Sequence, residues 1–173
     1  MPKSFLLTGL SGAGKTTLSK KVQELLQNQV DLVLIDGDEM RHGINSDLGF
    51  SRKDREENIR RCGEMAKLLA SQGKSTLLAL IAPYDSLRIR LQEILGPDSM
   101  RIIHVSCPLE ICISRDPKAN YRKALSGHIQ NYTGIADSYE IPANAHLVIE
   151  THKTPIEDCA KQIGDFILRE LAS

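Results

Sequence analysis

The chain has 173 residues, of which 41% are hydrophobic and 25% are charged, values typical of one globular domain with a continuous core. Its 22 basic residues balance 22 acidic residues, so it lacks the excess of cations with which a general nucleic-acid-binding protein displaces counterions. No apolar run is long enough to span a membrane, and the apolar N-terminal stretch is too short for a secretory signal, so we expect a cytoplasmic protein with neither a nucleic-acid nor a membrane partner.

Apolar strands alternate with amphipathic helices along the chain. In chain order, we predict a strand over Ser4–Thr8, a helix over Lys15–Gln27, a strand over Asp31–Ile35, a helix over Arg52–Ser71, a strand over Ser75–Ile81, a helix over Ser86–Leu95, a strand over Arg101–Ser106, a short helix over Pro108–Ser114, a strand over His146–Ile149 and a helix over Pro155–Leu171. This alternation is typical of a parallel sheet with helices on both faces. We therefore expect an α/β fold, a single three-layer αβα domain over residues 1–173 with a mainly parallel central sheet.

The pattern is interrupted between Asp116 and Asn144. This segment is polar, and proline, glycine and asparagine are scattered through it. A long irregular stretch inside a compact domain usually has a function, although it can also be a mobile surface excursion. We predict that residues 116–144 form a lid over the active site.

A glycine-rich motif follows the first predicted strand directly and opens the first predicted helix. It consists of Gly9, Leu10, Ser11, Gly12, Ala13, Gly14, Lys15 and Thr16, followed by Thr17, and it matches the pattern G-x-x-x-x-G-K-[ST]. In this pattern the backbone N–H groups and the helix N-terminus hold phosphate, the lysine bridges the β- and γ-phosphates, and the threonine hydroxyl is offered to Mg²⁺. The motif predicts a P-loop NTPase-type domain but does not distinguish a kinase from an ATPase or a GTPase. No guanine-recognition sequence of the form Asn-Lys-x-Asp follows, which disfavours a GTPase.

Two carboxylates stand at the end of the second predicted strand, in Asp36-Gly37-Asp38. Ligands of open parallel sheets bind beyond the carboxyl ends of the strands. Residues two apart in an extended chain point to the same side, so we expect Asp36 and Asp38 to face one site. One carboxylate would serve Mg²⁺ and the other would accept the proton of an acceptor hydroxyl. The spacing leaves this assignment open, and Asp-Gly is also a common solvated turn; we favour Asp38 as the base.

The residues that follow include cations and aromatic rings suited to a flat anionic acceptor. Arg41 and Arg55 are candidates for anion binding, because a guanidinium forms a planar fork on oxyanions. Asn58 lies three residues after Arg55 and therefore shares its helix face. Phe50 and Tyr132 lie outside any apolar stripe. Each alone could be a local packing residue, but together with the arginines they suggest a sandwich around a purine ring.

With these motifs the sequence resembles the adenylylsulfate kinase family from Phe5 to about Thr151. The matching stretches are GLSGAGKTT (Gly9–Thr17), DGDEMRHGINSDLGFSRKDREENIRR (Asp36–Arg61), CPLEICISRDPK (Cys107–Lys118) and YTGIADSYEIP (Tyr132–Pro142). The second stretch separates this family from other small P-loop kinases. The resemblance implies transfer of the γ-phosphate of ATP, with Mg²⁺ as cofactor, to the 3′-hydroxyl of adenylylsulfate (APS), which gives 3′-phosphoadenylylsulfate (PAPS) and ADP in sulfate assimilation.

The motifs and the resemblance together assign a role to each candidate site residue. The catalytic residues would be Lys15, Asp36 and Asp38, with Thr16 and Asp36 at Mg²⁺, residues Gly9–Thr17 at the ATP phosphates and Arg115 near the ATP base. The resemblance implies that the acceptor contacts are Asp38, Arg41, Phe50, Arg55, Asn58, Ile81, Ala82, Lys118, Asn131 and Tyr132. Family members are commonly homodimers and some are fused to ATP sulfurylase, so we expect a homodimer with a functional link to that enzyme.

The sequence departs from the family pattern at three places. Ala82 stands where the family usually has serine, which removes any role for a hydroxyl there, although direct in-line transfer needs none. Asp85 stands where many members carry a basic residue, and Asn131-Tyr132 replaces the usual Gly-Phe pair but keeps an aromatic face. Two alternatives stay open at this point: a P-loop kinase of another nucleotide-linked acceptor, and a nucleotide-binding regulatory subunit.

Overall fold

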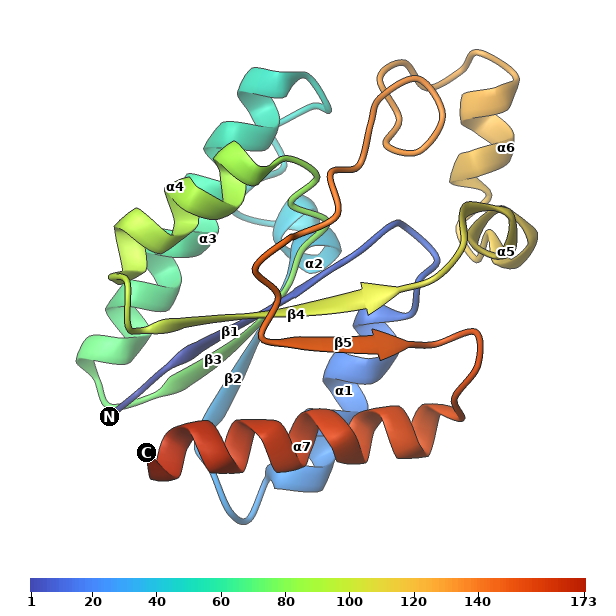
Figure 1. Cartoon of the computed structure of the whole chain (residues 1–173). Coiled ribbons are helices and arrows are strands. Elements are labelled where there is room, and N and C mark those ends of the chain that lie inside the picture. The colour runs from blue at the N-terminus through green and yellow to red at the C-terminus, as the bar shows by residue number, and fades with distance from the viewer.

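A five-stranded parallel sheet forms the centre of the computed structural model, which describes residues 1–173 (Figure 1). The strands are β1 (Ser4–Thr8), β2 (Leu32–Asp36), β3 (Ser75–Ala79), β4 (Met100–Ser106) and β5 (Leu147–Glu150), in the spatial order β2-β3-β1-β4-β5. Every neighbouring pair runs parallel; Ser4 of β1, for example, lies opposite Thr76 on one side and Met100 on the other. The predicted α/β fold with a parallel sheet is therefore confirmed.

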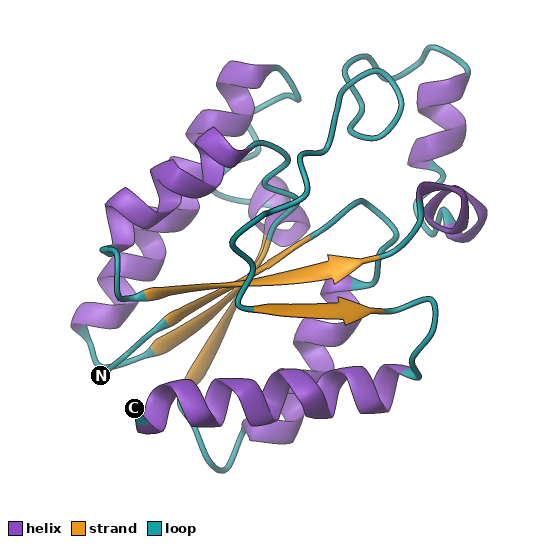
Figure 2. Ribbon diagram, in the orientation of Figure 1, coloured by secondary structure: helices purple, strands orange, loops and turns teal.

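Helices cover both faces of the sheet and form the two outer layers (Figures 1 and 2). The helices of the chain are α1 (Lys15–Leu26), α2 (Gly37–His42), α3 (Arg52–Ser71), α4 (Asp85–Leu95), α5 (Leu109–Arg115), α6 (Asn120–Leu125) and α7 (Ile156–Ala172). In the view of Figure 1, α1 and α7 pack together below the sheet, and α3 and α4 pack together above it. None of these helices is both long enough and apolar enough to cross a membrane.

Successive residues of β1 divide the hydrophobic core between the two faces of the sheet. Phe5 and Leu7 belong to the cluster formed with α1 and α7, whereas Leu6 belongs to the cluster formed with α3 and α4. All residues of this strand are buried, as expected for a central parallel strand whose side chains alternate between two helical layers. β1 ends at Thr8, and the glycine-rich loop starts at the next residue.

Two side-chain caps fix the starts of the helices that reach the carboxyl edge of the sheet. Oδ1 of Asp36 accepts hydrogen bonds from the backbone amides of Asp38 (2.8 Å) and Glu39 (3.4 Å) at the start of α2. Ser51 and Asp54 form a reciprocal capping box at the start of α3, with the Asp54 amide 3.1 Å from Ser51 Oγ and the Ser51 amide 3.3 Å from Asp54 Oδ2. Both caps satisfy backbone donors next to residues of the site described below.

The structure differs from the sequence-based prediction in two short helices. The predicted extended course from Asp36 to Asp38 is wrong: β2 ends at Asp36, whose side chain caps α2, so that Asp38 lies in the first helical turn. The second helix, α6, lies inside segment 116–144 and is too short and polar to show an apolar period. β3 also ends at Ala79, two residues before the predicted boundary at Ile81.

Candidate active site

A cavity of about 610 Å³ lies at the carboxyl edge of the sheet. Its wall is formed by loop 11–17, the starts of α2 and α3, residues 79–83 at the end of β3, and the chain that follows α5. The predicted site residues on this wall are Ser11, Gly12, Ala13, Gly14, Lys15, Thr16, Thr17, Asp38, Arg41, Phe50, Arg55, Asn58, Ile81, Ala82, Arg115 and Lys118. The predicted residues that do not line it are Gly9, Leu10, Asp36, Asn131 and Tyr132.

The loop between β1 and α1 has the backbone geometry of an anion-binding nest. Gly12 and Gly14 have φ angles of 76° and 104°, in the left-handed region that other residues rarely adopt. A side chain at Gly9 would collide with the carbonyl oxygen of Val105 in β4, so the loop can pack against the sheet only with glycine there. Because α1 begins at Lys15, directly after the loop, its N-terminus adds partial positive charge to the nest.

The side chain of Lys15 folds back over this loop. Its Nζ donates hydrogen bonds to the carbonyl oxygens of Gly9 (2.8 Å) and Leu10 (2.9 Å). Burial lowers the pKa of Lys15 to about 8, and the carboxylate of Asp38 only partly offsets this effect. A phosphate group in the loop would favour the charged ammonium, because a nearby negative charge raises the pKa of a lysine.

Asp36 joins the glycine-rich loop to α2. Its Oδ2 accepts a 2.7 Å hydrogen bond from the hydroxyl of Thr16, while its Oδ1 caps the helix. Both side chains offer the hard oxygen atoms that Mg²⁺ prefers, and Mg²⁺ commonly takes only one or two protein ligands beside water and substrate phosphates. No group of three or more His, Cys, Asp or Glu side chains is arranged to hold a metal ion. Thr16 and Asp36 therefore fit a metal ion that is bound together with nucleotide phosphates.

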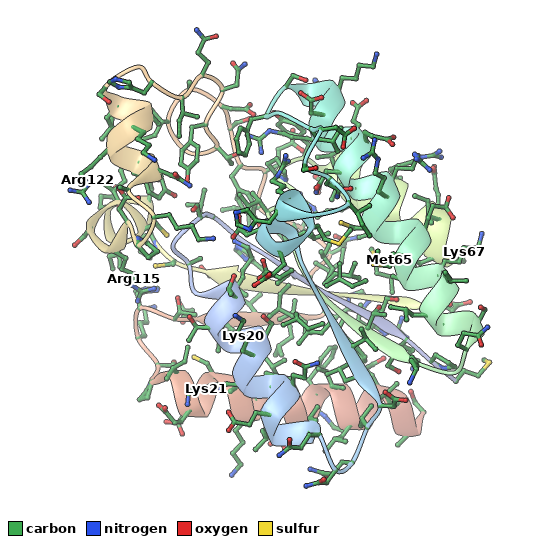
Figure 3. The ribbon with its side chains drawn as sticks, turned by 180° about the vertical axis from the view of Figure 1, so that it is seen from behind. Lys20, Lys21, Met65, Lys67, Arg115 and Arg122 are labelled. Atoms are coloured by element: carbon green, nitrogen blue, oxygen red, sulfur yellow. The ribbon has the colours of Figure 1, made fainter.

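Asp38 faces the cavity from the first turn of α2, and its carboxylate forms an ion pair with Lys118. Lys118 belongs to segment 116–144, so this ion pair connects that segment to α2. Arg115 comes directly before the same segment. Its guanidinium donates to the carbonyl oxygen of Thr151 over 2.9 Å, and Figure 3 shows it at the end of α5, beside the loop that follows β5.

Two arginines flank the ring of Phe50. The guanidinium carbon of Arg41 lies 4.7 Å from the ring centroid, and that of Arg55 lies 6.0 Å from it. Burial lowers the pKa of Arg41, and the neighbouring charge of Arg55 lowers it further, so an anion bound here would be stabilised by both cations. Phe50 is 43% exposed, which leaves ring surface for a flat ligand.

Arg55 and Asn58 share the face of α3 that is turned toward the cavity, as their spacing predicts. Both are buried. Arg55 donates to the carbonyl oxygen of Asn131 over 2.8 Å and lies 3.9 Å from the carboxylate of Asp137. Asn58 accepts a 2.9 Å hydrogen bond from Asn45. Both side chains are thus fixed by partners outside the cavity.

The backbone after β3 is held in an unusual conformation. Ala82 has a φ of 42°, in the left-handed region, and is 3% exposed. Its carbonyl oxygen accepts a 2.6 Å hydrogen bond from the buried guanidinium of Arg88, and the carbonyl oxygen of Ile81 accepts one of 2.5 Å from the hydroxyl of Thr8. Arg88 also donates to the carbonyl oxygen of Glu140 over 2.7 Å, so it ties this backbone to the end of segment 116–144.

Comparison with known proteins assigns the chain to a family. The family model described as "Adenylylsulphate kinase" matches residues 1–150. The chain belongs to the adenylylsulphate kinase family. It is 46% identical to the adenylyl-sulfate kinase of Geotalea uraniireducens over 99% of this chain and 83% of the relative, and 43% identical to that of Clostridium kluyveri over 92% and 80%. The structure of the Mycobacterium tuberculosis APS kinase in complex with AMPPNP and APS matches with a TM-score of 0.90 and 35% identity, over 99% of this chain and 98% of that one. The predicted enzyme class, an ATP-dependent adenylyl-sulfate kinase, is confirmed.

In this member of the adenylylsulphate kinase family, the predicted aromatic sandwich of Phe50 and Tyr132 is not formed. Tyr132 is 5% exposed and packs edge to face against Tyr121, with ring centroids 5.1 Å apart. It belongs to the core cluster with α1 and α7, where its ring is removed from solvent. Asn131 also lies off the wall and contributes only a carbonyl oxygen to Arg55.

Two residues were not predicted from the sequence: Thr151, which lies on the cavity wall, and Asn45, which contacts Asn58 behind it. Thr151 lines the cavity, and its hydroxyl donates to the carbonyl oxygen of Ala13 over 2.7 Å. It follows β5 at the carboxyl edge of the sheet, so the rule that ligands bind beyond strand ends was a signal that could have found it. Asn45 carries no such signal, because its role depends on a contact with α3 thirteen residues away.

Proposed function

We propose that this adenylyl-sulfate kinase binds ATP and APS in the single cavity described above and transfers the γ-phosphate of ATP to the 3′-hydroxyl of APS. One observation carries the proposal: the same cavity is lined by the glycine-rich loop and by Arg41, Phe50 and Arg55, which are predicted to bind the acceptor. The donor and acceptor can then meet at the carboxyl edge of the sheet. Alignment of two reactants in this way supplies much of the rate enhancement of phosphoryl transfer.

On the donor side, the amides of loop 9–17 and Lys15 bind the ATP phosphates. Lys15 would exchange the carbonyl oxygens of Gly9 and Leu10 for β- and γ-phosphate oxygens and so stabilise charge in the transition state. Thr16 and Asp36 would hold Mg²⁺, which neutralises charge on the phosphate oxygens when it is bound. Arg115, on the wall near Thr151, is assigned to the ATP base.

On the acceptor side, Asp38 is assigned as the residue that orients the 3′-hydroxyl and accepts its proton. Both carboxylate oxygens of Asp36 are already occupied, one by Thr16 and one by the α2 cap. The carboxylate of Asp38 instead faces the cavity, with Lys118 as its partner. This difference favours Asp38 over Asp36 as the base.

The remaining acceptor contacts follow from charge and shape. Arg41 and Arg55 would bind the phosphosulfate, because each guanidinium offers a planar set of donors to oxyanions. The exposed ring of Phe50 would stack on the adenine, and Asn58 would donate a hydrogen bond from the cavity wall. The backbone at Ile81 and Ala82 would complete this pocket.

Segment 116–144 would act as a lid. It carries Lys118 at the cavity mouth, and its far end is tied to the backbone after β3 through Arg88. Closure of this segment would exclude water, which would otherwise compete with the 3′-hydroxyl. The proposal further includes a cytoplasmic homodimer with a functional link to ATP sulfurylase, which sedimentation analysis with and without that enzyme would test.

An acceptor panel tests the proposed reaction. Purified protein is incubated with Mg²⁺, ATP and one of APS, AMP or CDP, and the products are identified by mass spectrometry. We expect PAPS and ADP with APS and no phosphorylated product with the other two acceptors, and Lys15→Ala should lower the rate by at least ~10²-fold. Faster phosphorylation of another nucleotide would favour the alternative kinase, and ATP binding without any transfer would favour a regulatory subunit.

A further inference from the structure

A fully buried asparagine lies in the loop between α2 and α3, behind the part of the cavity wall that is formed by Arg41, Phe50, Arg55 and Asn58. Asn45 is 0% exposed and does not line the cavity. Its backbone amide donates to the carbonyl oxygen of Met40 over 2.8 Å, which holds the residue at the end of α2. A buried amide side chain is costly unless it is hydrogen-bonded, so its partners indicate its role.

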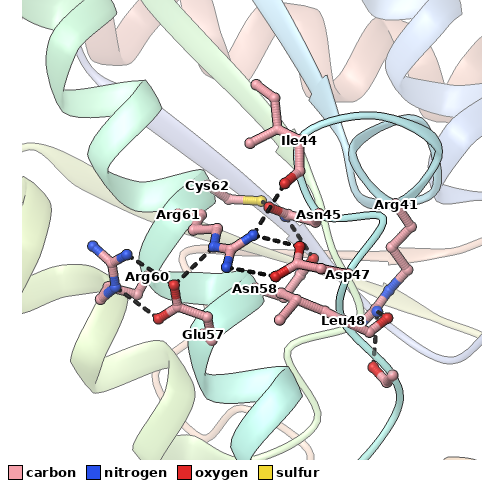
Figure 4. A network of polar contacts seen from close by, with 11 residues as sticks. Arg41, Ile44, Asn45, Asp47, Leu48, Glu57, Asn58, Arg60, Arg61 and Cys62 are labelled. Carbon is pink, nitrogen blue, oxygen red and sulfur yellow. Dashed lines mark hydrogen bonds and ion pairs between the residues drawn. The ribbon is translucent and has the colours of Figure 1, made fainter.

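The partner of Asn45 is the cavity residue Asn58. Nδ2 of Asn45 donates to Oδ1 of Asn58 over 2.9 Å and lies 3.8 Å from Sγ of Cys62 on the next turn of α3 (Figure 4). Because the carbonyl oxygen of the Asn58 side chain is bonded behind the wall, its NH₂ group is the part left for the cavity. An NH₂ group donates two hydrogen bonds, which suits the oxygen atoms of a phosphosulfate or a ribose.

The opposite orientation of both amides is less favourable. In the observed arrangement Oδ1 of Asn45 has no hydrogen-bond partner. If both amides were rotated, the NH₂ group of Asn45 would occupy that position, and two buried donors would lack partners in place of one acceptor. The surroundings of Asn45 therefore select the orientation in which Asn58 presents a donor to the cavity.

An ionic cluster on the surface fixes the loop that carries Asn45. Arg61 of α3 donates to the carbonyl oxygen of Ile44 over 3.0 Å and forms a two-pronged contact of 2.7 and 2.9 Å with the carboxylate of Asp47 (Figure 4). Glu57 lies on the same helix and accepts from Arg61 over 2.7 Å. The loop is thus attached to α3 on both sides of Asn45, and α3 also carries Asn58.

We infer that Asn45 is a positioning residue for APS, which acts by fixing the side-chain amide of Asn58 with its NH₂ group turned toward the acceptor. The inference rests on the proposed contact between Asn58 and APS. It predicts that Asn45 contributes to APS affinity only through Asn58, although Asn45 itself touches neither substrate.

A double-mutant cycle tests this dependence. The dissociation constants of APS and ATP are measured for the full chain and for Asn45→Ala, Asn58→Ala and the double variant. We expect each single variant to weaken APS binding by about 5- to 10-fold, as for the loss of one hydrogen bond, with ATP binding unchanged. In the Asn58→Ala background, Asn45→Ala should weaken APS binding no further.

The outcomes separate the inference from the proposed function. Unchanged APS affinity in Asn58→Ala would remove the proposed contact itself. A loss in Asn58→Ala together with an equal, additive loss from Asn45→Ala would overturn the positioning role, because a general loosening of the fold acts with or without Asn58. Should Asn45→Ala not fold, Asn45→Leu keeps a branched side chain but has no donor for Asn58; it should lower APS affinity at least as much, and wild-type affinity in that variant would overturn the inference.

Discussion

The hydroxyl of Thr16 and the carboxylate of Asp36 meet at 2.7 Å, which links the phosphate-binding loop directly to the end of β2. The same carboxylate caps α2 through its other oxygen, and α2 carries Asp38. The side chain of Asp36 therefore connects the glycine-rich loop, which is proposed to bind ATP, to the helix that carries the proposed base, Asp38. Its two oxygens have separate functions, which substitutions can distinguish.

Asp36→Asn should lower the Mg²⁺-dependent activity more than it lowers the stability of the fold. The amide keeps one oxygen to cap α2, but its NH₂ group replaces the oxygen that accepts from Thr16 and that would serve the proposed metal ion. We expect the Mg²⁺ concentration that gives half-maximal rate to rise, and activity at limiting Mg²⁺ to fall by roughly 10- to 100-fold, as for other residues that support a metal site. Steady-state kinetics across a Mg²⁺ titration measure this, with Thr16→Ser as a control that keeps the hydroxyl. An unchanged Mg²⁺ dependence would exclude Asp36 from the metal site.

Lys15 should make the stability of the nucleotide-free protein depend on pH. Its pKa is about 8 in the folded protein and near 10.5 in the unfolded chain, so between these values the unfolded chain binds more protons. The contribution of Lys15 to the free energy of unfolding therefore increases as pH rises through this window and is lowest below pH 8.

The measurement is the melting temperature of wild type and Lys15→Met at a series of pH values from 7 to 10. The difference, wild type minus variant, should become more positive by several degrees as pH rises, because the variant has no ammonium to desolvate. Other titrating groups cancel in this difference. A difference that does not change with pH would contradict the lowered pKa.

Phe50→Ala should weaken APS binding selectively. Loss of a stacked base typically costs about 1–3 kcal/mol, which corresponds to a KM for APS raised by about 5- to 150-fold. The KM for ATP should stay unchanged, because Phe50 lies outside the glycine-rich loop that is proposed to bind the ATP phosphates. Phe50→Tyr keeps the ring and should retain most of the affinity. Equal KM values for APS in wild type and Phe50→Ala would remove Phe50 from the acceptor pocket.

Arg88→Met should destabilise the protein through the backbone after β3. The substitution leaves the carbonyl oxygens of Ala82 and Glu140 without their guanidinium donor, and the unsatisfied buried acceptor at Ala82 costs about 1–3 kcal/mol. Arg90→Met on the same helix is the matched control. Its ion pair with Glu93 is exposed and should contribute less than about 1 kcal/mol. Urea denaturation of both variants measures the contrast, and similar losses for the two would show that Arg88 does not anchor this backbone.

Much of the fold could be predicted from the sequence because its signals are local. β1 and α3 have the predicted bounds, since β1 is a continuous apolar run and α3 has a regular apolar period behind a Ser–Asp capping box. The glycine-rich loop could be predicted for the same reason. Its motif residues are consecutive, and its glycines permit the backbone conformation that the loop adopts. The short helices α2 and α6 contain too few residues for a period to be seen.

The remainder of the site depends on contacts between segments far apart in the sequence. Tyr132 is buried because Tyr121 lies beside it, and no local pattern shows which aromatic residue faces a ligand and which packs in the core. The same limit applies to Asn45, because its hydrogen bond with Asn58 forms only when the loop that carries Asn45 packs against α3. Sequence therefore predicted the residue types of the site better than the direction in which each side chain points.

The proposed role of Asp38 as proton acceptor is tested by the turnover of Asp38→Asn, measured together with the affinities of this variant for both substrates. Asparagine keeps the size and hydrogen-bonding capacity of the side chain but is a far weaker proton acceptor than a carboxylate. We predict that ATP and APS bind with near wild-type affinity by calorimetry, while the rate of PAPS formation with both substrates saturating falls by about 10²-fold or more. A rate close to that of wild type would exclude this role, because the cavity would then transfer phosphate without the residue assigned to accept the proton.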